Sequence, residues 1–302
     1  MALTLSTSST FQNSGSGMSK IAISESIQHV EPAGPSLQVV NRKEIPAGHF
    51  QVNLPIWGRI SSASLTEGVD LTDPQDVTVT VRTLTGTRHG ALIFLSDRLI
   101  DQNVESVAAE SGGMLGNSVG RLLESDIVTL YDGFSTSQPG AGNAASILHL
   151  GWANAYLRTD NNTSFGAAPE RPSAVLHPEQ IRRLWQDVSG IQAAGSVGLA
   201  AQPIPEGMTE DVVKNYFRGN EPLTGIKIME SGVISRDGSG DAKGGIFAKQ
   251  ALWVAMEQEY KAAIQRDESL FGEELVGSAV WGEGEAVDTW GYELYSAADA
   301  NA

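Results

Sequence analysis

Five residues, Gly116-Asn117-Ser118-Val119-Gly120, match the G-x-S-x-G pattern that surrounds the nucleophilic serine of many hydrolases. In those enzymes a strand precedes the serine and a helix follows it, so that the hydroxyl group stands on a strained turn. Here the flanking apolar residues recur every three or four positions, which is typical of a continuous helix. We therefore favour a helix packed through small residues and keep a serine hydrolase that uses Ser118 as the alternative.

Two glycine-rich stretches resemble ligand-binding loops. Residues 140–145, GAGNAA, resemble a dinucleotide-binding turn, with Asp160 about where a ribose-binding acid would follow, but polar residues precede them instead of a buried strand. Residues 237–241, DGSGD, begin like a calcium loop, yet Ala242 and Ala248 stand where glycine and glutamate are needed. We interpret the first as a loop that enters a helix and the second as a hairpin turn.

The remaining candidates are histidines and one glycosylation-like triplet. The five histidines have no H-x-x-x-H or H-E-x-x-H spacing; they are His29, His49, His89, His149 and His177. The triplet at 162–164, NTS, is read as a turn. The sequence therefore predicts no catalytic, cofactor-binding or metal-ligating residue, and no cofactor.

His177 follows a short apolar run and precedes Pro178, in SAVLHPEQIRRLWQDV. A histidine at the end of a strand can be a base or a metal ligand. Proline in the first turn of a helix instead favours a purely structural corner. The residues alone leave both readings open.

Composition excludes several classes of function. The chain has 302 residues with a net charge of −16, which disfavours sequence-specific binding to nucleic-acid phosphates. Cysteine is absent, so neither disulfides nor thiolates contribute. We expect no signal peptide, and no stretch approaches the ~18 apolar residues that cross a membrane.

The patterning predicts a series of distinct segments. Residues 1–36 are rich in Ser, Gly and Pro and predict a flexible arm. Between residues 37 and 84 we expect β-strands joined by Pro/Gly turns, including the half-buried strand of Val77, Val79 and Val81. Pro55 favours an edge strand.

Helical spacing dominates the next part of the chain. Residues 101–132 predict a helix of about eight turns, and its four glycines, Gly112, Gly113, Gly116 and Gly120, suggest close packing or a bend. From residue 144 to 245 we expect mixed helix and strand, with 194–220 as loop and with Ile181, Leu184, Trp185 and Val188 forming the buried stripe of a helix. Further strands end the chain, where residues 251–302 hold 11 acidic and 2 basic residues.

In this order of segments, the chain resembles the major capsid proteins of tailed bacteriophages, the Hong Kong 97-like fold. Residues 101–132 resemble the spine helix of that family, and SAVLHPEQIRRLW resembles the strand and helix of its axial domain. LTGIKIMESGVI resembles the strand leading out of that domain, and residues 244–288 resemble the return through the peripheral domain. Together these stretches cover most of residues 85–295.

The resemblance implies an α+β fold in five parts. These are an N-terminal arm at 1–36, an extended β-hairpin loop at 37–86, a peripheral domain with the spine helix at 87–140, an axial domain at 141–245 and a peripheral return segment at 246–302. It also implies that the His177 corner is a packing element.

The implied function is that of a major capsid protein, not an enzyme. Copies would assemble into the hexamers and pentamers of an icosahedral head that encloses double-stranded DNA without reading its sequence. Expected partners are other copies, a separate scaffolding protein, a portal protein and a decoration protein, with no membrane. The location would be the virion, and the host cytoplasm during assembly.

Two further expectations accompany the resemblance. Lys43 is the only lysine of the loop, and no partner for a covalent cross-link can be matched, so non-covalent contacts are expected to hold the shell. An acidic inner wall would let packed DNA slide. An encapsulin-type compartment shell, which shares the fold but encloses enzymes, is the alternative.

Overall fold

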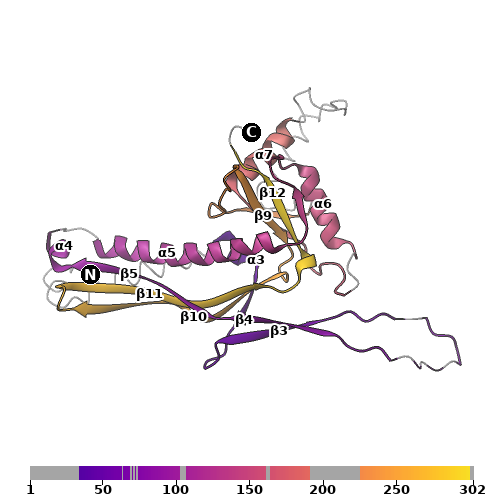
Figure 1. Ribbon diagram of the computed structural model, residues 1–302, viewed down its shortest axis with the longest axis horizontal. Helices are drawn as coiled ribbons and strands as arrows, with labels where there is room; N and C mark the ends of the chain where they lie inside the picture. The colour runs from indigo at the N-terminus through magenta and orange to yellow at the C-terminus, as the bar shows by residue number, and fades with distance from the viewer. Residues whose placement is uncertain are drawn as a thin grey trace, which may run out of the picture.

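The computed structural model describes residues 34–102, 107–160, 164–190 and 225–299, except residues 63, 69, 71 and 73. In chain order its elements are α3 (Pro35–Val39), β2 (Asn41–Glu44), β3 (Gln51–Trp57), β4 (Val79–Thr85), β5 (Thr87–Ser96), α4 (Asp97–Gln102), α5 (Val107–Thr129), η1 (Leu130–Gly133), β6 (Ser137–Pro139), α6 (Ile147–Arg158), β7 (Ser173–Leu176), α7 (Pro178–Gly190), β8 (Lys227–Glu230), β9 (Asp241–Phe247), β10 (Leu252–Asp267), β11 (Gly272–Glu285), η2 (Asp288–Trp290) and β12 (Gly291–Ala297). Figure 1 shows three parts: a long sheet with α5 beside it, a second sheet with α6 and α7, and a projecting hairpin.

The long sheet has the strand order β2-β10-β11-β5. β10 and β11 form an antiparallel hairpin from Leu252↔Glu285 to Asp267↔Gly272, and β5 adds antiparallel to β11. α5 packs on one face, where Leu115 and Leu275 are buried together. Gly112, Gly113 and Gly116 of α5 are buried, which agrees with close packing, whereas Gly120 faces open space.

The second sheet has the order β6-β12-β9-β7-β8. β12 pairs antiparallel with β9 and parallel with β6, so the C-terminal strand lies among strands from earlier in the chain. Its apolar core includes Leu150 and Leu157 of α6, Leu176 of β7 and Leu184 of α7. The 3.6-residue period of α6 and α7 brings these side chains onto the sheet.

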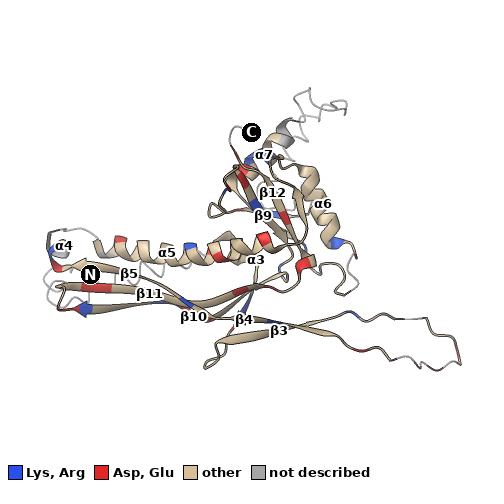
Figure 2. Cartoon of the chain, in the orientation of Figure 1, with Lys and Arg blue, Asp and Glu red and all other residues tan. Residues whose placement is uncertain are grey.

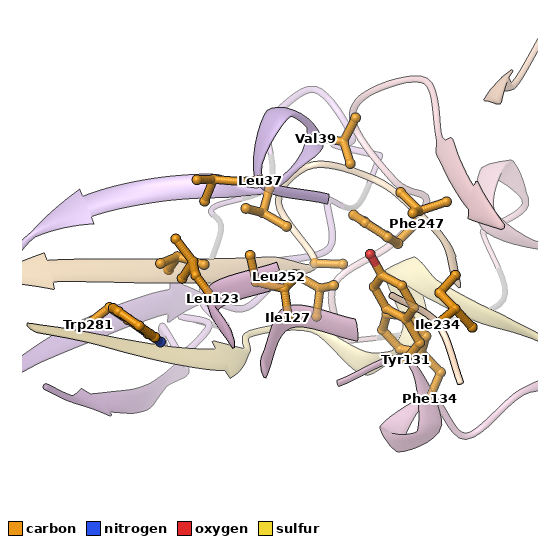
Figure 3. Packing of buried hydrophobic residues seen from close by; sticks show 14 of the residues in the cluster. Leu37, Val39, Leu123, Ile127, Tyr131, Phe134, Ile234, Phe247, Leu252 and Trp281 are labelled. Carbon is orange, nitrogen blue, oxygen red and sulfur yellow. The ribbon is translucent and has the colours of Figure 1, made fainter. Parts of the chain in front are cut away.

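The largest apolar cluster lies where the two sheets meet. Tyr131 follows α5 in η1, and its ring centroid lies 5.4 Å from that of Phe247 in β9. The ring centroid of Phe134 lies 6.2 Å from that of Phe247. Figure 3 shows all three side chains among the residues of this cluster. α3 completes this cluster with Leu37 and Val39, and β10 contributes Leu252. One continuous core therefore joins the two sheets.

The boundaries predicted for the arm and loop were wrong. Ser36 is buried in α3, where its amide and hydroxyl both donate to the carboxylate of Glu124 in α5. β2 pairs with β10 in the long sheet, so residues up to Ile45 belong to the core and only 51–85 form the hairpin. Residues 1–33 lie outside the described residues.

Three other predictions need correction. The predicted helix of residues 101–132 ends earlier than expected, because α5 ends at Thr129 and the chain turns into η1. Trp185 is half exposed rather than buried, because the interior face of α7 is already filled by Leu184 and Ile181. The return segment 246–302 was assigned to one domain, but β10 and β11 lie in the long sheet whereas β12 pairs with β9 and β6 in the second sheet. The predicted loop at 194–220 lies outside the described residues.

Among the described residues, no helix is long and apolar enough to cross a membrane.

Candidate assembly surface

The structure places Ser118 inside α5, where its hydroxyl donates to the carbonyl of Leu115 at 2.8 Å. No strand leads into it, so the strained turn of a hydrolase nucleophile is not formed. The GNSVG pattern is explained by the packing of α5 on the long sheet. The serine hydrolase reading therefore loses its structural basis.

The glycine loop at 140–145 connects β6 to α6. The carboxylate of Asp241 accepts a hydrogen bond from the Gly142 amide at 3.0 Å, so this amide already has an acceptor. β6 is a short edge strand, exposed over most of its length, rather than the buried strand that a dinucleotide site needs. Asp160 is ion-paired with Arg59.

The DGSGD stretch forms the turn that the sequence predicts. The Asp237 amide donates to the carbonyl of Asp241 at 2.8 Å, and the Asp237 carboxylate accepts from the amides of Ser239 and Asp241. In the part of the chain that the structure describes, no group of three or more His, Asp or Glu side chains is arranged to hold a metal ion.

His177 lies at the corner between β7 and α7. Its Nδ1 accepts the Glu179 amide at 3.0 Å, and its own amide donates to Oε1 of Gln180 at 3.1 Å. Burial, together with the positive charge of Arg236, lowers the pKa of the imidazole. These contacts close the first turn of α7, which is a structural role.

The other described histidines lie apart. His149 accepts from the Ser146 amide at the start of α6. His89 stacks on Trp281 with ring centroids 4.0 Å apart, and His49 is in a turn before β3. His29 and residues 162 and 163 of the predicted turn lie outside the described residues.

The most distinctive surface belongs to the hairpin of β3 and β4. Cross-strand partners share a face, so Trp57 lies with Val79, and Pro55 lies with Val81. We call these four residues the hairpin face. Trp57 is 65% exposed and Val81 is 54% exposed, although period-two alternation normally marks a half-buried strand.

The opposite side of the hairpin is fixed at its root. Leu54 and Leu84 are buried against Ile45 and Ala255 of the core. At this crossing β11 carries glycine: a Cβ on Gly282 would lie 2.1 Å from the carbonyl oxygen of Thr85. The hairpin therefore has one apolar side in the core and one apolar side without cover.

Charge is sparse on strands β3 and β4, whereas two carboxyl groups of β11 lie near the hairpin root. β3 has no charged residue and β4 has only Arg82, as Figure 2 shows. Burial raises the pKa of Glu283 and Glu285 in β11, and the carboxylates of Asp126 and Asp288 respectively raise these pKa values further. An uncharged apolar face of this kind is suited to contact with protein.

Comparison with known proteins then gives the fold a context. No family model matches the chain, and no curated protein is significantly similar in sequence. Solved structures do match. The capsid of cyanophage P-SCSP1u is 17% identical, with a TM-score of 0.60 over 86% of this chain and 87% of that one. The capsid of Helicobacter pylori bacteriophage KHP30 is 10% identical, with a TM-score of 0.66 over 86% and 88%.

The chain has the Hong Kong 97-like capsid fold. The chain is also similar to a virus-like particle from Pyrococcus furiosus, at 13% identity and a TM-score of 0.59 over 91% of this chain and 98% of that one. The α+β class predicted from the sequence is confirmed. Sequence reasoning placed the valines of the hairpin in a strand but missed that their face is uncovered.

Proposed function

We propose that the chain is the major capsid protein of a tailed double-stranded DNA bacteriophage and acts by self-assembly rather than by catalysis. The observation that carries this proposal is the match to phage capsid structures over 86% of the chain. The uncovered hairpin face supports it, because a subunit of a shell must leave apolar surface for its neighbours. Copies would form hexamers and pentamers of an icosahedral head.

In this function the parts of the chain take the following roles. The long sheet with α5 is the peripheral domain, and the five-stranded sheet with α6 and α7 is the axial domain. Residues 51–85 are the extended loop, whose hairpin face lies over an adjacent subunit. Residues before Gly34 are the arm. β12 belongs to the axial domain, which ties the end of the chain to its middle.

We further propose that the mature shell is held without covalent cross-links. Nζ of Lys43 donates to the backbone carbonyl of Asn53 at 3.1 Å, so this lysine is engaged within its own chain. A separate scaffolding protein, a portal protein and a decoration protein complete the particle. Assembly takes place in the host cytoplasm, and the head encloses DNA without sequence-specific contacts.

Sedimentation of purified protein tests the role of the hairpin face. Val81→Asp places a charge on this face, and we expect it to abolish shell-sized particles without changing the circular dichroism of the chain. Thr80→Asp is the matched control, because Thr80 is exposed on the opposite side of the same strand. We expect this variant protein to assemble into shell-sized particles. A Val81→Asp variant that assembles like the parent would overturn this role.

The contents of the particles separate the two kinds of shell. DNA inside particles made in infected cells supports a phage head. A protein cargo without DNA would instead identify an encapsulin-type compartment and contradict the proposal. The fold alone matches both a phage capsid and a virus-like particle with similar TM-scores of 0.60 and 0.59.

A further inference from the structure

The hairpin is held at a second point beyond its root. Gly58 closes the strand pair through its amide, which donates to the carbonyl of Thr78 at 2.8 Å. The next residue, Arg59, leaves the hairpin and contacts the connection between α6 and β7. Its amide donates to the carbonyl of Ser164 at 2.9 Å, and its guanidinium pairs with the carboxylate of Asp160. Residues far apart in the chain are thus joined.

The receiving connection has a defined shape around the arginine. Gly166 has a φ of +73°, a backbone conformation that glycine adopts easily, and a Cβ there would lie 3.1 Å from Nη1 of Arg59. The Gly166 carbonyl accepts Nε1 of Trp290 at 3.1 Å, and the ring of Phe165 meets that of Trp290 edge-on at 6.4 Å. Trp290 immediately precedes β12. Arg59 therefore connects the hairpin to the five-stranded sheet.

The two attachments differ in how easily they can open. At the root, Leu54 and Leu84 are buried, and their release would expose apolar surface to water. At Arg59 the paired side chains are 53% and 50% exposed. Exposed ion pairs are weak and are screened by salt. The connection between β3 and β4 contains the exposed apolar residues Ile60, Leu65 and Val77. Figure 1 shows that this connection projects away from both sheets.

We propose that Arg59, Asp160 and residues 164–166 form a releasable latch that sets the direction in which residues 60–77 project and so controls readiness for assembly. This inference rests on the proposed function. A latched chain presents its projecting residues in one direction, which lowers the entropy lost when they contact a neighbouring copy. Opening the latch leaves the fold intact and makes that direction variable.

Distance measurements on the unassembled chain test the latch directly. The chain has no cysteine, so Leu65→Cys and Gly232→Cys provide a unique pair of spin-label sites, one on the projecting segment and one on an exposed turn. We expect a narrow distance distribution that broadens in Arg59→Gln, in Asp160→Asn and at high salt. Distributions that are the same in parent and variants would overturn the latch.

Assembly gives the second readout. Loss of an exposed ion pair corresponds to about a two- to fivefold rise in the critical protein concentration for shells. Arg59→Gln and Asp160→Asn should each show this rise. The critical concentration of the double variant should be no higher than that of either single variant. Arg88→Gln, which removes an exposed arginine from β5, is the control and should leave the critical concentration unchanged.

The outcomes distinguish this inference from the function on which it rests. If the parent assembles and the latch variants have the same critical concentration, the latch is wrong and the capsid function stands. If the parent with its scaffolding partner forms no shells, the capsid function fails and the inference fails with it.

Discussion

Phe271, at the turn between β10 and β11, is the only non-glycine residue in the described parts of the chain with a positive φ, at 52°. This conformation costs a residue with a Cβ about 1–2 kcal/mol. Phe271 is 71% exposed, so packing of its side chain offsets little of this cost. We expect Phe271→Gly to raise the free energy of unfolding by about 0.5–1 kcal/mol, measured by urea denaturation. Leu270→Gly, next to it with an ordinary φ, should not stabilise; stabilisation by both would contradict the argument.

Two glycines should respond to alanine in opposite directions. A Cβ on Gly245 would lie 2.7 Å from two atoms of the Tyr131 ring, whereas nothing lies within 4 Å of one on Gly120 in α5. Gly245→Ala should therefore lower the free energy of unfolding by about 1–3 kcal/mol, because the added methyl group overpacks the core. Gly120→Ala should raise the free energy of unfolding by up to about 1 kcal/mol, because alanine has the higher helix propensity. Thermal and urea unfolding check both, and loss of stability in Gly120→Ala would contradict the open space around it.

The carboxyl groups of Glu283 and Glu285 predict a pH dependence. Burial, with Asp126 and Asp288 respectively, raises both pKa values above that of the unfolded chain. The folded state then binds more protons than the unfolded state, so their contribution to stability falls as pH rises from the unfolded pKa of ~4.3 through the raised folded pKa. Glu283→Gln should stabilise at pH 7 and flatten the pH profile of unfolding, whereas Glu257→Gln, exposed on β10, should do neither.

At the scale of elements, α3 is attached through a buried polar network. The Tyr131 hydroxyl donates to Oγ of Ser36 at 2.7 Å, and Oγ of Ser36 and of Ser231 donate to the carboxylate of Glu124. Ser36→Ala removes the central hydroxyl and leaves the Tyr131 hydroxyl without its acceptor, at a cost of about 1–3 kcal/mol. Limited proteolysis at residues 34–40 should accelerate in Ser36→Ala and not in Ser125→Ala, a control beside Glu124. Equal protection in both variants would disprove the role of the network.

The elements that sequence patterns predicted well are those whose own period matches their burial. α6, β7 and α7 were predicted because local spacing and Pro178 define them. α3 was missed because its five residues give no helical period, and its position depends on Glu124, 88 residues away in sequence. The position of β12 depends on its pairing with β9 and β6. Local sequence patterns do not predict this pairing, because both partner strands are distant in sequence.

The candidate surface was only partly predictable for a different reason. The alternating Val77, Val79 and Val81 predicted a strand here, and β4 contains Val79 and Val81 but begins after Val77. The alternation was taken to mean a half-buried face. Within one chain, Val79 and Val81 remain exposed because the proposed cover is another copy. A single sequence does not distinguish burial inside a subunit from burial between subunits.

At the scale of the whole molecule, the arrangement explains how one chain can serve as a repeating unit. A continuous core joins the two sheets, so the subunit is a single body with a hairpin projecting from it (Figure 1). The hairpin root is buried and its outer face is apolar and uncharged. In the proposed capsid function, such a face would contact the next copy in a ring, and rings of this kind close into shells.

Electron cryomicroscopy of particles from cells that express the chain with its neighbouring genes tests the central claim most directly. We predict closed icosahedral shells of uniform diameter in which residues 51–85 of one copy lie over an adjacent copy, with Trp57 and Val81 buried between them. Only monomers or small oligomers in the presence of a scaffolding partner, or closed shells in which the hairpin face stays exposed to solvent, would contradict the account.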